Sequence, residues 1–140
     1  MSTDHAATVR AMYDAFGRGD VEAILAHVAE DAEWEPWPDN HGQRAGVALL
    51  AARRGHAGVA EFFATCATMQ YHAFEVHDLM TGGDKVGVTL RICATPPGGQ
   101  RFDDEIMHLF TFDAAGKVRA FRQYVDTAKQ LACMGLPLCG

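Results

Sequence analysis

The stretch that decides the fold runs from Gln100 to Asp126 and reads QRFDDEIMHLFTFDAAGKVRAFRQYVD. It predicts a long β-hairpin: a strand over Gln100–Phe112, a turn over Asp113–Gly116 and a strand over Lys117–Asp126. Gly116 suits this turn because glycine adopts the positive φ angle that closes it.

The two faces of this hairpin differ in polarity. Alternation places on one face of the first strand the residues Phe102, Asp104, Ile106, His108, Phe110 and Phe112. The opposite face carries Asp103, Glu105, Met107, Leu109 and Thr111. On the second strand we expect Phe121, Gln123 and Val125 to face inward. His108 is the only imidazole on the apolar face, which makes it the first candidate for a functional residue.

The bulk composition excludes several classes of function. A chain of 140 residues fits one domain with one core. The net charge of −6 disfavours nucleic-acid binding, because an acidic surface repels phosphates. No apolar run approaches the roughly 20 residues that cross a bilayer, and no signal peptide is evident. We therefore expect a cytoplasmic protein without a membrane partner.

The four cysteines are Cys66, Cys93, Cys133 and Cys139, and none forms the CxxC pair of a structural zinc site. We expect free thiols, with a Cys133–Cys139 disulfide as the alternative. Gly82-Gly83 and Gly98-Gly99 read as hairpin turns, and neither precedes a helix as a phosphate-binding loop would. No metal or other cofactor is expected.

The rest of the chain predicts helices first and strands later. The expected helices are Asp4–Phe16 capped by Ser2 or Thr3, Val21–Val28 capped by Asp20, Val59–Ala67, and a short one from a Thr127 cap to Met134. The further strands are Ala32–Trp37, Tyr71–Leu79 and Lys85–Thr95. Residues 39–57 are expected to form an extended loop holding one short helical piece, and residues 135–140 a loose tail. This order predicts an α+β domain with helices on one face of an antiparallel sheet.

Several motifs, in this order, resemble one superfamily. They are Tyr13-x-x-Phe16, Gly19-Asp20-Val21-x-x-Ile24, Glu30-Asp31-Ala32-x-Trp34, Gly58-Val59-Ala60-Glu61-Phe62-Phe63, Phe112-Asp113-x-x-Gly116-Lys117-Val118 and Arg122-Gln123-Tyr124-Val125-Asp126. Together they resemble the nuclear-transport-factor-2-like superfamily, in its SnoaL-like and ketosteroid-isomerase-like branch, and the resemblance implies a domain core over about residues 3–127.

The resemblance implies a cone, in which a curved sheet wraps over three helices and encloses an apolar pocket. Family members include isomerases, cyclases, hydrolases and pure binding proteins, so the fold alone does not define the function. It implies a small hydrophobic ligand and a homodimer through the outer sheet face. The implied pocket residues are Met12, Tyr13, Phe16, Trp34, Phe62, Phe63, Phe110, Phe121, Gln123 and Val125.

The catalytic residues of ketosteroid isomerases carry over only in part. His108 falls where those enzymes keep a protonated aspartate that helps to hold an oxyanion. The proton-abstracting aspartate falls on Pro36, and the tyrosine donor falls on Met12, one residue before Tyr13. A steroid isomerase by that mechanism is therefore not expected.

Two functions remain open. The first is a cofactor-independent isomerase, cyclase or hydrolase that acts on a hydrophobic carbonyl or cyclic compound, with His108 as its polar centre. Its partner would be a carboxylate from Glu35, Asp39 or Asp104, although Glu35 is expected on the opposite strand face. The second is a non-catalytic ligand-binding or interaction module.

Overall fold

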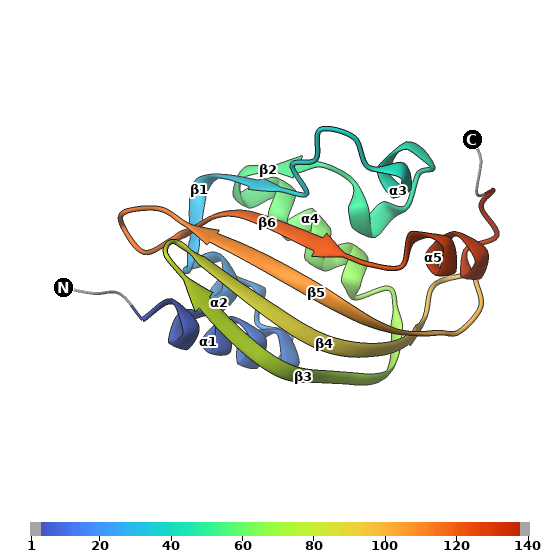
Figure 1. Ribbon diagram of the computed structural model, residues 1–140, viewed down its shortest axis with the longest axis horizontal. Coiled ribbons are helices and arrows are strands. Elements are labelled where there is room, and N and C mark those ends of the chain that lie inside the picture. The colour runs from blue at the N-terminus through green and yellow to red at the C-terminus, as the bar shows by residue number, and fades with distance from the viewer. Residues whose placement is uncertain (1–3, 138–140) are drawn as a thin grey trace.

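The computed structural model describes residues 4–137, and its centre is one six-stranded sheet (Figure 1). The strand order is β2-β1-β6-β5-β4-β3. Only β1 and β6 run parallel, and the other neighbouring pairs are antiparallel. The predicted α+β fold is confirmed.

The predicted hairpin lies in the middle of the sheet as β5 (Phe102–Phe112) and β6 (Val118–Tyr124). Gly116 has φ +79°, and the Asp113 carboxylate accepts hydrogen bonds from the amides of Ala115 and Lys117 within the turn. Burial alternates along β5 as predicted, with His108 inside and its neighbours Met107 and Leu109 half-buried on the outer face.

Two N-terminal helices, α1 (His5–Gly17) and α2 (Val21–Leu25), begin at side-chain caps. The cap of α1 is Asp4, whose carboxylate accepts a hydrogen bond from the Ala7 amide, and not Ser2 or Thr3, which lie outside the described residues. Helix α2 ends three residues earlier than predicted, because Val28 already pairs with Val118 in the sheet.

Strand β1 (Val28–Trp34) therefore starts earlier than predicted and also ends earlier. It ends because Glu35 has φ +58°, a left-handed conformation that breaks an extended strand. The expectation that Glu35 points to the opposite face was wrong, since this turn directs its side chain into the interior, where it is fully buried.

The segment predicted as an extended loop is more structured than expected. It contains α3 (His41–Arg44), the 3-10 helix η1 (Ala48–Leu50) and the two-residue strand β2 (Arg53–Arg54). Helix α4 (Gly55–Cys66) also begins four residues before the predicted start. Val47 and Leu50 pack with Leu131 in a small second core, so apolar burial fixes this segment against the C-terminal helix.

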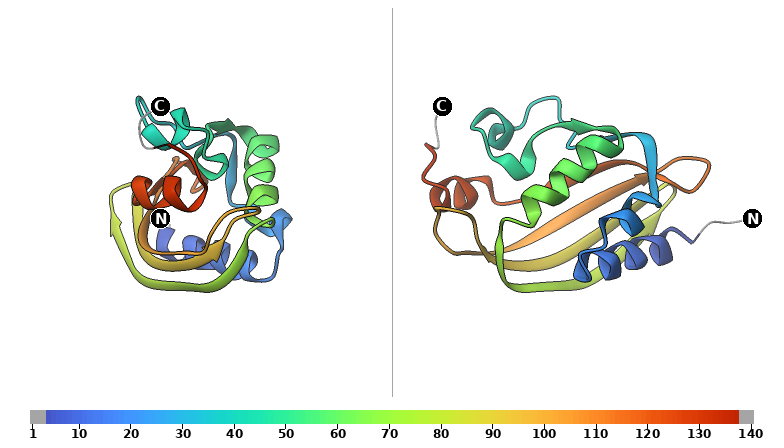
Figure 2. Two further views of the ribbon diagram at one scale, coloured as in Figure 1. Left: turned by 90° about the vertical axis from the view of Figure 1, so that its right-hand side faces the viewer. Right: turned by 180° about the vertical axis from the view of Figure 1, so that it is seen from behind.

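The remaining strands are β3 (Gln70–Gly82) and β4 (Lys85–Thr95), and the chain continues to α5 (Thr127–Cys133). Asp126, and not Thr127, caps α5 by accepting a hydrogen bond from the Lys129 amide. The sheet is strongly curved, and α1 and α4 lie on its concave side (Figure 2). The main core fills the space between them.

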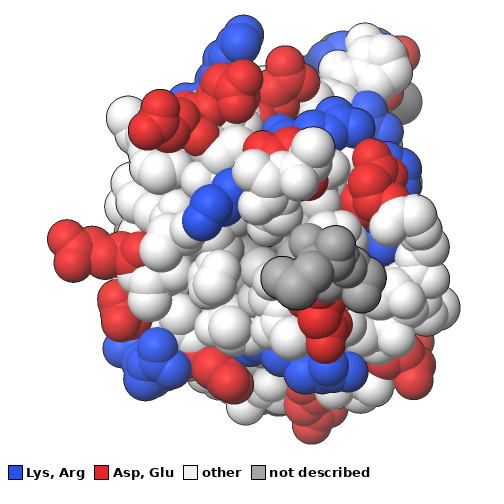
Figure 3. Space-filling model, turned by 90° about the vertical axis from the view of Figure 1, so that its left-hand side faces the viewer, with Lys and Arg blue, Asp and Glu red and all other residues white. Residues whose placement is uncertain are grey.

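The surface carries charges of both signs. At the end of the molecule that bears the β3–β4 and β5–β6 turns, acidic and basic side chains alternate around an uncharged area (Figure 3). Within residues 4–137, no helix has the length and apolar character needed to cross a membrane.

Candidate functional site

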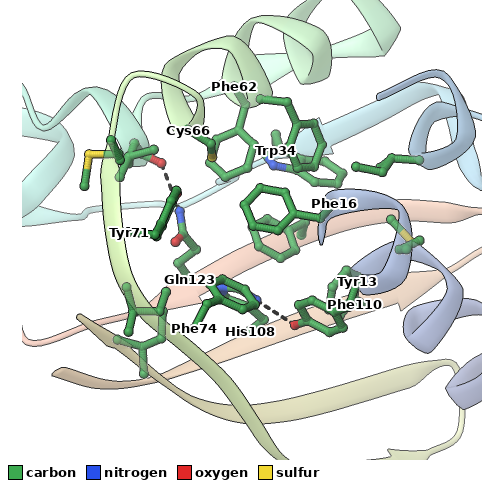
Figure 4. Close-up of a pocket in the computed structure, with 18 of the residues that line it drawn as sticks. Tyr13, Phe16, Trp34, Phe62, Cys66, Tyr71, Phe74, His108, Phe110 and Gln123 are labelled. Atoms are coloured by element: carbon green, nitrogen blue, oxygen red, sulfur yellow. Dashed lines mark hydrogen bonds between the residues drawn. The ribbon is translucent and has the colours of Figure 1, made fainter. Parts of the chain in front are cut away.

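A cavity of about 70 Å³ lies between the helices and the concave face of the sheet (Figure 4). Most of its wall is apolar or aromatic. The lining residues are Met12, Tyr13, Phe16, Ile24, Trp34, Leu49, Phe62, Phe63, Cys66, Met69, Tyr71, Phe74, Ile92, Phe102, Ile106, His108, Phe110, Phe121, Gln123 and Gln130. A ligand in this cavity would lose most of its contact with water.

Partly exposed lining residues indicate where the cavity meets the surface. Six lining residues keep some exposure: Tyr13, Phe16, Phe63, Met69, Tyr71 and Phe74. The five aromatic side chains among them come from α1, α4 and β3, and Met69 lies in the loop between α4 and β3. The entrance is therefore an aromatic rim between two helices and the edge strand.

His108 is a buried polar group in the cavity wall, and its hydrogen-bond partner lies on α1. The Tyr13 hydroxyl lies 2.7 Å from His108 Nδ1, and the two rings are stacked with centroids 5.9 Å apart (Figure 4). Phe110 and Phe121 pack around the same imidazole. The helix offset that separates Tyr13 from the expected tyrosine position thus does not remove it from the cavity.

Burial determines the charge state of this pair. Desolvation lowers the pKa of His108 to about 3, and the neighbouring polar side chain of Gln123 acts in the opposite direction. Desolvation likewise raises the pKa of Tyr13 above its ordinary value. Both groups are therefore neutral near pH 7, and His108 offers one nitrogen as donor and the other as acceptor.

Gln123 lies directly across the strand pair from His108 and is hydrogen-bonded to a buried carboxylate. Gln123 Nε2 donates to Glu35 Oε2 at 3.0 Å and to the Leu49 carbonyl at 3.0 Å (Figure 4 draws the second). Glu35 Oε1 accepts from the Gln123 amide and from Trp37 Nε1. The buried polar groups thus form two hydrogen-bonded sets, Glu35 with Gln123 and His108 with Tyr13, which lie side by side on neighbouring strands.

The Glu35 carboxyl is fully buried, and this environment shifts its pKa. Burial raises its pKa, while hydrogen bonds from the Gln123 amide, Trp37 and the Gln123 side chain, and the Arg122 charge, oppose that rise. Glu35 does not line the cavity. It is hydrogen-bonded to Gln123, which does line the cavity.

Two buried polar atoms in the cavity wall have no hydrogen-bond partner among residues 4–137. They are the indole nitrogen of Trp34 and Oε1 of Gln130. The Trp34 side chain is 1% exposed and Gln130 is 4% exposed. Because unpaired buried polar groups are costly, these two atoms are candidate contacts for a bound molecule.

The other expected carboxylates lie away from the cavity. Asp39 is on the surface, where it pairs with Arg44 at 2.9 Å. Asp104 is buried on the face of His108, but it accepts hydrogen bonds from the Asp126 amide and from Lys129 Nζ at the β6–α5 junction. Neither lines the cavity, so neither can be the direct partner of His108 there. Val125 is half-buried in the core and is also absent from the cavity wall.

Sequence reasoning missed part of the wall. The additional lining residues come from α2, η1, α4, the loop after it, β3, β4, β5 and α5: Ile24, Leu49, Cys66, Met69, Tyr71, Phe74, Ile92, Phe102, Ile106 and Gln130. Alternation already placed Phe102 and Ile106 on the face of His108. Nothing in the sequence pattern indicated Leu49 or Gln130, since both reach the cavity from segments fixed by the second core.

Metal ligation finds no support in the described part of the chain, where no three His, Cys, Asp or Glu side chains gather as ligands would. Cys66, Cys93 and Cys133 are buried free thiols. Cys139, the partner in the alternative disulfide, lies outside the described residues.

The chain belongs to the SnoaL-like domain family, whose model matches residues 9–121. Similar solved structures include NTF2-like proteins from Burkholderia pseudomallei and Burkholderia xenovorans, with 25% and 27% identity and TM-scores of 0.77 and 0.73. These two alignments cover 94% and 95% of this chain, and 98% of each of the other chains. TerC, co-crystallised with polyporic acid, is 25% identical with a TM-score of 0.75, over 95% of this chain and 99% of its own. No curated protein sequence matches the chain.

Proposed function

We propose that this protein takes up a small, largely apolar carbonyl-containing or cyclic molecule and acts on it by cofactor-independent acid/base chemistry. The reaction class is isomerisation, cyclisation or hydrolysis. The observation that carries the proposal is the buried Tyr13–His108 pair in an otherwise apolar cavity wall. A neutral imidazole bonded to a hydroxyl is suited to hold a polar group and to relay a proton.

Two further observations support uptake of an organic molecule. The wall leaves Trp34 Nε1 and Gln130 Oε1 without partners among the described residues, so a bound polar group would gain hydrogen bonds there. The similar structure TerC was co-crystallised with polyporic acid. That ligand belongs to TerC, and for this chain it only supports a search among organic molecules.

The second candidate is a non-catalytic binding protein. It is favoured by the absence of any carboxylate from the cavity wall formed by residues 4–137. A binding protein and an enzyme would share the same ligand contacts, but only the enzyme would convert the ligand. Mass spectrometry of each bound compound after incubation distinguishes them.

The test is a screen of small cyclic ketones, lactones and phenols by thermal shift, on the wild type and on His108→Ala. We expect compounds that stabilise the wild type to lose this effect in His108→Ala, because the pair that holds the polar group is gone. The substitution itself should cost about 1–3 kcal/mol, since water can enter in place of the imidazole.

The matched control is His72→Ala, which removes an exposed imidazole bonded to Thr95 on the sheet edge. It should leave the screen unchanged. If His108→Ala binds every compound as the wild type does, the histidine is structural. If it fails to fold, Tyr13→Phe tests the same pair by removing a single oxygen.

A further inference from the structure

Trp34 brings a buried hydrogen-bond donor to the cavity wall. Its Nε1 has no hydrogen-bond partner among residues 4–137, although the residue is only 1% exposed and lines the cavity. An indole N–H can donate and cannot accept, so its partner must be an acceptor. Because a buried donor without a partner is costly, an acceptor that enters the cavity would gain a hydrogen bond there.

The surroundings of the indole explain why its nitrogen is unpaired. The Trp34 ring is stacked on Phe121 with centroids 4.6 Å apart, and it contacts Phe62 and Phe63 at 6.0 and 6.3 Å. These hydrocarbon rings hold the indole in one orientation and carry no oxygen that could accept from it. In Figure 4 the nitrogen of Trp34 lies toward the middle of the lining side chains. The indole therefore presents a fixed donor to the cavity.

The other polar groups of the wall do not fix a direction. Oε1 of Gln130 also lacks a partner among the described residues, but rotation of the terminal amide by 180° exchanges its oxygen and nitrogen. Gln130 can therefore meet either a donor or an acceptor. The Tyr13–His108 pair is equally permissive, since a hydroxyl and a neutral imidazole can each donate or accept. Of these groups, Trp34 alone determines what a ligand must supply.

The sheet separates Trp34 from the Tyr13–His108 pair. Trp34 is the last residue of β1 and His108 lies on β5, with β6 between the two strands. Neighbouring strands are about 4.8 Å apart, so β1 and β5 are separated by roughly 10 Å. Phe121 of β6 contacts both rings, with centroids 4.6 Å from Trp34 and 5.0 Å from His108. A molecule that reaches both polar points therefore needs a polar group at each end.

We infer that Trp34 binds an acceptor oxygen of the ligand, while Tyr13 and His108 bind a second polar group of the same molecule. The ligand class is a ring compound with polar groups at two ends, one of which is a carbonyl or ether oxygen. This inference rests on the proposed uptake and specifies its ligand. A compound with a polar group at one end only would leave the indole donor unpaired and would bind less tightly.

The first arm of the test compares 4-hydroxyacetophenone with 4-ethylphenol, which share a phenol ring and differ by a carbonyl in place of a methylene. In calorimetric titrations we expect the ketone to bind about tenfold tighter, as one neutral hydrogen bond allows. Trp34→Phe should remove most of this advantage. Trp37→Phe makes the same change outside the cavity wall, where the indole already donates to Glu35, and should keep the advantage.

The second arm observes the indole proton of the wild type. ¹H–¹⁵N spectra of the labelled protein contain one indole signal for each of the two tryptophans, and Trp37→Phe identifies the signal of Trp34. We expect 4-hydroxyacetophenone to move the Trp34 indole proton further downfield than 4-ethylphenol does, because a hydrogen-bonded proton is deshielded. The two probes carry the same phenol ring, so their ring-current effects are similar. This arm decides the inference if Trp34→Phe fails to fold.

Failure of the inference and failure of the proposed uptake give different results. If both probes bind but the ketone has no advantage, or Trp34→Phe keeps that advantage, uptake stands and the role of Trp34 is overturned. The same conclusion follows if the Trp34 signal responds equally to both probes. If neither probe binds, the uptake of small ring compounds is refuted, and with it this inference.

Discussion

Glu35 has the only positive φ angle among the non-glycine residues of the described chain, at +58°. A left-handed backbone costs an L-residue about 1–2 kcal/mol relative to glycine. Here the strain is held in place by three hydrogen bonds to the carboxylate, from Gln123 and Trp37, and by Gln43, which donates to the Glu35 carbonyl. The left-handed conformation of Glu35 therefore places its carboxylate within hydrogen-bond distance of the Gln123 backbone and side chain.

This strain predicts an unusual order of stability. Both Glu35→Gly and Glu35→Ala lose the carboxylate, but only glycine relieves the backbone, so Glu35→Gly should be the more stable by about 1 kcal/mol. Urea unfolding of the two variants measures the difference. At Glu33, in the regular part of β1, the order should be reversed. The same order at both positions would contradict the interpretation.

A pH dependence follows from His108. Its pKa falls from 6.5 to about 3 on folding, so the folded state binds fewer protons between these values. The free energy of unfolding therefore does not depend on His108 protonation above pH 6.5, and it decreases as the pH falls from 6.5 toward 3. The total decrease is several kcal/mol at most. The raised pKa of Glu35 acts with the opposite sign above the ordinary value of 4.5.

Urea unfolding at pH 4, 5, 6 and 7 checks this dependence. His108→Gln, which cannot titrate, should be less sensitive to acid than the wild type over this range. Equal slopes for the two proteins would show that His108 does not carry the effect.

At the scale of elements, Asp104 joins β5 to the start of α5. Its carboxylate accepts hydrogen bonds from the Asp126 amide at 3.1 Å and from Lys129 Nζ at 3.3 Å, and the residue is 6% exposed. Asp104→Ala should therefore destabilise the protein by about 1–3 kcal/mol, because the Asp126 amide and Lys129 Nζ lose a shared, buried acceptor.

Asp103 is the matched neighbour for that measurement. It pairs with Arg91 on the exposed outer face, where an ion pair contributes about 1 kcal/mol or less. Asp103→Ala should cost clearly less than Asp104→Ala in the same denaturation experiment. An equal cost would argue against a structural role for the buried carboxylate.

The sequence predicts the strands of this protein better than it predicts the residues of the candidate site. Alternation is a local pattern, so β5 and the inward position of His108 could be predicted from β5 alone. The position of Glu35 could not, because a regular strand was assumed through a residue that is left-handed. The cavity wall draws Leu49 and Gln130 from segments whose order depends on the second core, and no short-range pattern encodes that packing.

At the scale of the whole molecule, an apolar outer patch suggests self-association. It consists of Met80, Met107, Leu109 and Tyr124 around Gly87, on the convex face of the sheet. Met80 and Tyr124 are 50% and 41% exposed. We propose a homodimer through this patch, since contiguous exposed apolar area favours burial against a second copy.

Light scattering tests the dimer at micromolar concentrations. The wild type should have twice the chain mass of 15.2 kDa, and Leu109→Glu should reduce it to that of one chain. Glu22→Lys, a charge change on α2 away from this patch, should remain dimeric. A monomeric wild type would refute the proposal.

The two tryptophans occupy different environments, and this has a spectroscopic consequence. Trp34 is stacked on Phe121 in the cavity wall, with ring centroids 4.6 Å apart. Trp37 lies beside Tyr124 at 4.9 Å and under the Arg122 guanidinium, next to the outer patch. Fluorescence from a Trp37→Phe protein would therefore report on occupancy of the interior, and fluorescence from a Trp34→Phe protein on contact between subunits. The molecule thus carries separate intrinsic optical reporters for its two proposed binding events.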